Sequence, residues 1–87
     1  MNKLAFEDRP PFTDWVNAYD KQHFVTYLRL LDASADGADW RTAVQIIFGL
    51  DADQDPERAK IVHDRHLARA RWMTENGYRY LLDPGRR

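Results

Sequence analysis

Three aspartates at alternate positions, Asp51, Asp53 and Asp55, imitate the start of a calcium-binding loop. An EF-hand loop begins with carboxylates in this spacing, but it also requires a glycine at its sixth position and a bidentate glutamate at its twelfth. Those two positions hold Pro56 and Val62 in this sequence. Calcium binding is therefore not expected, and the acidity of the stretch needs another explanation.

The histidines and the nucleophilic residues do not form a zinc-site or catalytic pattern either. His63 and His66 lie three residues apart without a third ligand beside them, and His23 stands alone. Such histidines belong more often to a helix surface or a core than to a zinc site. The sequence has no cysteine, a single serine (Ser34), no Gly-rich phosphate loop and no nucleophile motif. We therefore expect no bound metal, no cofactor and no enzymatic activity.

Length and composition indicate one small domain. The chain has 87 residues, of which 44% are hydrophobic and 31% charged, so it can bury one compact core. The lack of cysteine suits a reducing compartment. No apolar run approaches the ~18 residues of a membrane span, and the first residues lack the apolar stretch of a signal peptide. We expect a cytoplasmic monomer that does not associate with membranes.

Charge is distributed unevenly along the chain. Residues 1–57 hold five Lys or Arg against eleven acidic residues, which gives −6, whereas residues 58–87 hold eight against three, which gives +5. A dedicated DNA-binding module usually presents a basic face. A basic end attached to an acidic body therefore weakens the expectation of DNA binding.

The first part of the chain is predicted to form an arm and one helix. Residues 1–18 are assigned to an N-terminal arm, because Pro10 and Pro11 remove hydrogen-bond donors and disfavour helix. Thr13 is predicted to cap a helical turn near the end of this arm. Asp20 is expected to cap a helix that ends near residue 34. Four residues at spacings of three and four are expected to form its buried face: Phe24, Tyr27, Leu28 and Leu31.

Two further helices are predicted from their caps. A short helix over residues 40–48 follows Asp39 as its cap, is apolar around most of its surface, and ends at Gly49. A longer helix over residues 56–76 follows Asp55 as its cap and begins with a proline. The two helices are joined by an acidic turn. The domain is expected to span residues 19–82, with residues 83–87 as a tail.

The last helix carries most of the basic residues. At ~100° per residue its apolar residues fall into two stripes, and Arg58, Arg65 and Arg69 are expected to lie between these stripes. Mixed charges occupy the opposite, solvated face: Lys60, Asp64, Arg71 and Glu75.

The order of a short buried helix, a turn and a longer helix is that of helix-turn-helix domains. The predicted fold is therefore all-α, a small helical bundle of the helix-turn-helix type with an extended turn.

The turn and the start of the next helix hold four acids: Asp51, Asp53, Asp55 and Glu57. Capping and the helix dipole explain Asp55 and Glu57, but not Asp51 and Asp53. Because acids near phosphates oppose the electrostatic term in DNA binding, this surface is interpreted as one that avoids DNA.

The motif Gly-Tyr-Arg-Tyr-Leu-Leu at residues 77–82 closes the predicted domain. Together with residues 24–33, 37–41, 47–49 and 69–76, it resembles a proteobacterial domain-of-unknown-function family. The family is described as an extended-turn helix-turn-helix domain carried on mobile genetic elements. The resemblance covers about residues 19–82.

This resemblance implies a role as an antiactivator. Long members of the family are two-domain activators of conjugative transfer that bind DNA, whereas short acidic members bind the N-terminal domain of such an activator and repress transfer. The short, acidic chain fits the second group, so its expected partner is that N-terminal domain, and DNA binding is expected to be weak or absent. Five residues are predicted to dock the partner: Tyr27, Arg29, Leu30, Trp72 and Tyr80. The alternative, supported by the basic last helix, is a small DNA-binding transcriptional regulator or excisionase-like factor.

Overall fold

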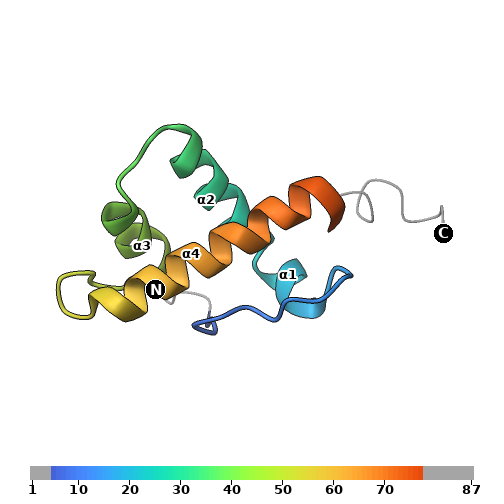
Figure 1. Cartoon of the computed structure of the whole chain (residues 1–87), viewed down its shortest axis with the longest axis horizontal. Coiled ribbons are helices and arrows are strands. Elements are labelled where there is room, and N and C mark those ends of the chain that lie inside the picture. Colours follow the sequence, from blue (N-terminus) through green and yellow to red (C-terminus); the bar gives the residue numbers. More distant parts are fainter. Residues whose placement is uncertain (1–4, 78–87) are drawn as a thin grey trace.

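The computed structural model describes residues 5–77, and the described chain is all-α, which confirms the predicted fold class. The described residues form four α-helices followed by a π-helical turn, and Figure 1 shows how the α-helices are arranged. Their bounds are α1 (Ala18–Gln22), α2 (Phe24–Ala35), α3 (Trp40–Phe48), α4 (Pro56–Trp72) and η1 (Met73–Gly77). None of the helices in the described range is long and apolar enough to cross a membrane.

The long helix α4 is the axis of the fold, and both α2 and α3 pack against it (Figure 1). The larger core cluster joins Leu30 of α2 and Val44 and Phe48 of α3 to Ala59 and Val62 of α4. A smaller cluster near the end of α4 contains Tyr27, Ala70 and Met73. One side of α4 is thus buried along its whole length, and the other side is left for solvent.

The ends of α3 and the start of α4 agree with the prediction. Asp39 precedes α3 in an extended conformation, and Gly49 ends it with a φ of 75°, in the left-handed region that favours glycine. Asp55 caps α4 by accepting a hydrogen bond from the backbone N–H of Arg58 at 3.3 Å, and Pro56 occupies the first helical position. Asp55 therefore caps α4 as predicted, whereas Asp39 occupies the N-cap position of α3 without a side-chain capping hydrogen bond.

The start of the first helix differs from the prediction. Asn17, not Asp20 or Thr13, is its N-cap: the Asn17 side chain accepts the backbone N–H of Asp20 at 2.8 Å, and the Asp20 carboxylate accepts the N–H of Asn17 at 3.0 Å. This reciprocal capping box places Asp20 inside α1. The predicted helical turn after Thr13 is absent, and the helical segment is divided at His23 into α1 and α2.

The buried face of α2 is rotated from the predicted one. Tyr27 and Leu30 are each only 1% exposed, whereas Leu28 is 46% exposed. Tyr27 belongs to the predicted face, and its hydroxyl donates a hydrogen bond to the buried Asp20 carboxylate at 2.9 Å. Leu30 takes the place predicted for Leu28, because it packs in the core cluster with Val44 and Phe48 of α3.

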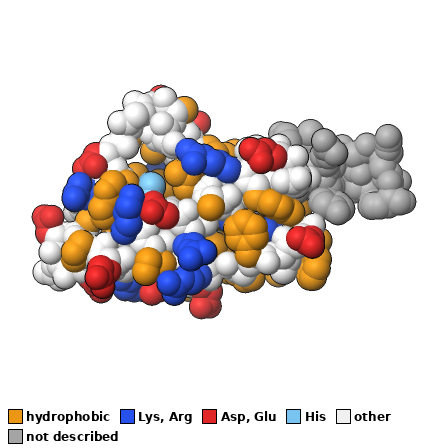
Figure 2. Space-filling view, in the orientation of Figure 1, with side chains coloured by type: hydrophobic (Ala, Val, Ile, Leu, Met, Phe, Trp, Pro, Cys, Tyr) orange, Lys and Arg blue, Asp and Glu red, His pale blue; other side chains and the backbone are white. Residues whose placement is uncertain are grey.

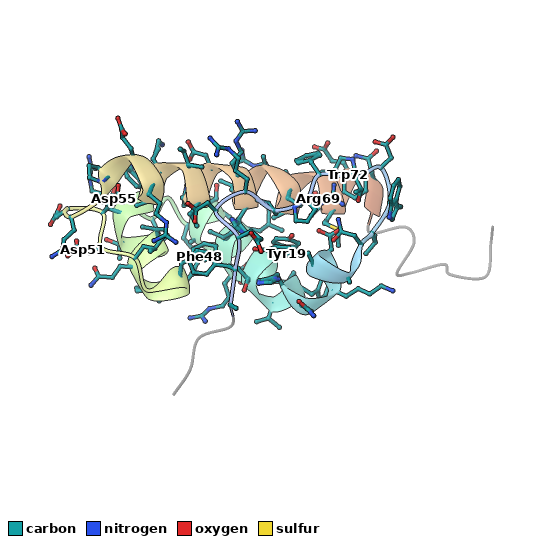
Figure 3. The ribbon with its side chains drawn as sticks, turned by 90° about the horizontal axis from the view of Figure 1, so that it is seen from below. Tyr19, Phe48, Asp51, Asp55, Arg69 and Trp72 are labelled. Atoms are coloured by element: carbon teal, nitrogen blue, oxygen red, sulfur yellow. The ribbon has the colours of Figure 1, made fainter. Side chains whose placement is uncertain are left out.

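The N-terminal arm, residues 5–17, lies along the bundle rather than apart from it (Figure 3). The Phe6 ring packs edge-on against Phe48, with 5.0 Å between centroids. His23 Nε2 lies 2.8 Å from the carbonyl oxygen of Ala5, and the Tyr19 hydroxyl accepts the backbone N–H of Glu7 at 3.0 Å. The predicted boundaries at residues 18 and 82 stay predictions.

Candidate nucleic-acid interface

Four of the five basic residues of α4 are exposed, namely Arg58, Lys60, Arg65 and Arg71. The fifth, Arg69, was expected to lie with Arg58 and Arg65 between the apolar stripes, but its side chain is fully buried. It is held by Asp20, whose carboxylate lies 2.7 Å from Arg69 Nη2. Arg69 is therefore part of the core and not of a binding surface.

The exposed cations of α4 differ in their partners. Arg58 pairs with Asp8 of the arm at 3.0 Å, and Lys60 pairs with Asp64 at 3.4 Å. Arg71 donates a hydrogen bond to the Ser34 hydroxyl at 3.1 Å. Within residues 5–77, Arg65 makes neither a hydrogen bond nor an ion pair. Arg65 is thus the α4 cation whose donors are all available to a ligand.

A groove between the starts of α3 and α4 brings two cations to an aromatic ring. The Arg41 guanidinium and the Lys60 ammonium each lie 4.9 Å from the centre of the Trp40 ring. The groove has a volume of about 630 Å³ and is lined by Trp40, Arg41, Pro56, Glu57, Lys60 and Ile61. It is open to solvent, and its lining combines two cations that can bind an anion such as a phosphate with one acid, Glu57.

Acidic residues are interleaved with these cations on the molecular surface. Figure 2 shows Lys and Arg side chains separated by Asp and Glu on one face, without a continuous basic patch. Asp64, beside Lys60, is one of these acids, and its pKa shows that it is ionised. Burial alone would raise this pKa, but the hydrogen bond from His63 and the charge of Lys60 outweigh burial and hold it below its ordinary value of 3.8. Asp64 is therefore a carboxylate beside Lys60 at neutral pH.

Asp51 and Asp55 form hydrogen bonds that hold the turn and the start of α4. The Asp51 carboxylate accepts the backbone N–H of Asp53 at 2.9 Å, and the Asp51 carbonyl oxygen accepts the N–H groups of Gln54 and Asp55 at 3.1 and 3.2 Å. Asp55 then caps α4. Glu57 lies in the first turn of α4, where the helix dipole favours a negative charge. In Figure 3 the labelled Asp51 and Asp55 lie at one end of α4, and Arg69 and Trp72 lie toward the other.

The residues predicted to dock a protein partner do not form one surface. Tyr27 and Leu30 are core residues, each 1% exposed. Arg29 is exposed on α2, whereas Trp72 is half-buried with its ring centre 3.9 Å from the Arg69 guanidinium. Tyr80 lies outside the described residues. Only Arg29 and part of Trp72 are accessible among the four that the structure describes.

His23 and His66 face the interior, whereas His63 is partly buried beside Asp64. His66 Nδ1 donates to the Val62 carbonyl oxygen at 2.8 Å, so its Nε2 accepts the Tyr19 hydroxyl at 2.7 Å. Burial lowers the pKa of His66 to about 4, which keeps the ring neutral at pH 7. Across residues 5–77, no group of three or more His, Cys, Asp or Glu residues is arranged to hold a metal ion.

The fold and the surface define a small helical domain of the helix-turn-helix class, in which a short buried helix precedes a longer basic one. The chain belongs to a family of transcription-factor DNA-binding domains, RovC_DNA-bd, described as "T6SS, Transcription factor, DNA binding domain", whose family model matches residues 2–83. No relative among curated proteins matches the chain.

This family corrects the expectation that DNA binding is weak or absent. That expectation relied on the acidic turn, whose acids Asp51 and Asp55 are explained by hydrogen bonds within the turn. The antiactivator interpretation assumed that the domain does not bind DNA, and the family match removes this assumption. The match favours the alternative, a DNA-binding regulator. The family is one of DNA-binding domains and not of enzymes.

Proposed function

We propose that this chain binds duplex DNA as the DNA-binding part of a transcriptional regulator, using the exposed side of α4 and the adjoining start of α3. The observation that carries the proposal is the family match over residues 2–83. The assignment of the surface rests on the exposed cations of these two helices, Arg41, Lys60, Arg65 and Arg71.

Arg65 is the proposed principal contact. Its guanidinium has no partner within residues 5–77, so binding a ligand costs it no existing interaction. A guanidinium donates two parallel hydrogen bonds to a phosphate or to the O6 and N7 atoms of guanine. Arg65 stands in the middle of α4, ten positions after Asp55, which is about 15 Å along the helix axis.

Arg41 and Lys60 are the proposed phosphate contacts at the Trp40 groove. Lys60 already pairs with Asp64, but both side chains are about half exposed, at 50% and 49%. Such a surface pair is weak, so a phosphate can replace the carboxylate at the ammonium. Contacts of this kind position the protein on DNA, whereas base contacts provide sequence preference.

Fluorescence anisotropy with a labelled mixed-sequence duplex of two helical turns tests the proposal. At ~50 mM salt the parent chain is expected to bind with a dissociation constant in the range of about 10⁻⁶ to 10⁻⁴ M, which is typical of non-specific binding, or more tightly. Arg65→Ala is expected to weaken binding and to reduce the slope of log Kd against log salt by about one.

Arg29→Ala is the matched control, because it removes another exposed arginine from the side of α2 that faces away from α4. It is expected to leave the slope unchanged. Lack of duplex binding by the parent at low salt would overturn the function. Equal effects of Arg65→Ala and Arg29→Ala would overturn the assignment of the surface.

A further inference from the structure

We propose that the N-terminal arm withholds Arg58 from DNA, with Asp8 occupying the guanidinium that would otherwise contact a phosphate. The inference rests on the proposed function and adds a regulatory contact to the same surface. It follows from an ion pair between the arm and the first turns of α4, between residues that are 50 positions apart in the sequence.

The geometry of this pair resembles that of an arginine with a phosphate. Arg58 Nε donates to both carboxylate oxygens of Asp8, at 3.0 Å and 3.1 Å, and Arg58 Nη2 lies 3.0 Å from Asp8 Oδ1. Carboxylate and phosphate oxygens take the same fork of guanidinium donors. Arg58 therefore cannot offer these donors to DNA while Asp8 holds them.

The pair is also accessible and exchangeable. The side chains of Arg58 and Asp8 are 44% and 45% exposed, so water and salt screen their attraction. A buried pair such as Asp20 with Arg69 has no such access, since both of its side chains are fully buried. The arm thus reduces the positive charge offered by α4 without locking it permanently.

The rest of the arm presents Asp8 at this position. Phe6 packs against Phe48 and lies under Arg58, whose guanidinium carbon is 5.8 Å from the centre of the Phe6 ring. The backbone of Glu7 is tied to the Tyr19 hydroxyl, and the carbonyl oxygen of Ala5 lies beside His23. None of these contacts involves the Asp8 carboxylate, so its removal is expected to free Arg58 while the arm stays docked.

Asp8→Ala and Glu7→Ala form a matched pair for the test. Both remove one negative charge from the arm, but the Glu7 carboxylate is exposed and only its backbone N–H makes a hydrogen bond. In the same duplex-binding assay, Asp8→Ala is expected to bind about threefold more tightly than Glu7→Ala, the gain from one more phosphate contact. The salt slope of Asp8→Ala is expected to steepen by about one.

The same two substitutions in an Arg58→Ala background complete the cycle. If Asp8 acts by withholding Arg58, its advantage over Glu7→Ala disappears when Arg58 is absent. Equal affinities of the two variants in the parent background, weaker binding by Asp8→Ala, or an advantage that persists without Arg58 would each overturn the inference. Loss of duplex binding by the parent itself would instead count against the proposed function, so the two failures are distinguishable.

Discussion

Arg69 and Asp20 form an ion pair inside the protein, with 2.7 Å between Nη2 and Oδ2 and no exposure of either side chain. Arg69 Nε also donates to Asp20 Oδ1 at 3.0 Å, and Nη1 and Nη2 donate to the carbonyl oxygens of Thr13 and Trp15 at 2.7 and 2.9 Å. The Asp20 carboxylate also accepts the Tyr27 hydroxyl. One buried arginine therefore connects α4 to α1, α2 and the arm, and both ions have all the hydrogen bonds that burial requires.

Replacing Arg69 with methionine is expected to destabilise the fold by about 3–5 kcal/mol, because it leaves the Asp20 carboxylate buried without its counter-ion. Urea unfolding measures the change. Arg71→Met, on the exposed side of the same helix, serves as the control and is expected to change stability by no more than about 0.5 kcal/mol. Equal stabilities of the two variants would show that the pair does not hold the arm and helices together.

Acid is expected to weaken this pair. Burial alone would raise the pKa of Asp20, but hydrogen bonds from Arg69, Asn17 and Tyr27 outweigh burial and hold it below the ordinary value of 3.8. A pKa lowered by folding contributes stability above pH 3.8, and this contribution is lost as pH falls through the lowered value. Unfolding free energies measured from pH 4 downward are expected to fall in the parent and to fall less steeply in Asp20→Asn.

His66 is expected to produce a second pH dependence at higher pH. Folding lowers its pKa from 6.5 to about 4, so the unfolded chain takes up the proton first. Stability is fully present above pH 6.5 and declines as pH falls toward about 4, by up to ~3 kcal/mol. His66→Gln is expected to flatten the unfolding free energy over this range, whereas His63→Gln retains the slope. A parent whose stability does not change between these pH values would contradict the prediction.

Core truncation is expected to distinguish Phe48 from Trp40. Phe48 is 5% exposed and its ring contacts Phe6 and His66, so Phe48→Ala should cost about 3–5 kcal/mol. Trp40 is only partly buried and borders the groove beside Lys60, so Trp40→Ala should cost less. Thermal melts of both variants test this order. The reverse order would place Trp40 in the core.

Elements that are defined by local signals were predictable from the sequence. Helix α3 begins after Asp39 and ends at Gly49 as predicted, because an apolar helical pattern is followed directly by a left-handed glycine. The start of α4 is set in the same way by Asp55 and Pro56. In each case the residues that decide the structure are neighbours in the chain.

Contacts between distant residues were not predictable in this way. Asp20 and Arg69 are 49 positions apart, and helical periodicity places Arg69 between two apolar stripes without identifying its partner. Asp20 is also an internal residue of α1, where Asn17 is the N-cap through a reciprocal capping box with Asp20. The sequence located the basic helix of the proposed interface. It did not show that Arg58 binds Asp8 and Arg71 binds Ser34, because these partners are far away in the chain.

The acidic turn is expected to act on stability and not on DNA. Asp55→Ala removes the N-cap of α4 and should lower the free energy of unfolding by about 1 kcal/mol. Asp53→Ala keeps the hydrogen bond from the backbone N–H of residue 53 to Asp51, so it should change this free energy by no more than about 0.5 kcal/mol. Urea unfolding tests this difference. In the duplex-binding assay, Asp53→Ala is expected to gain less affinity than Asp8→Ala, because no cation of α4 is paired with Asp53. Binding tightened by Asp53→Ala as much as by Asp8→Ala would show that the turn faces DNA and opposes it.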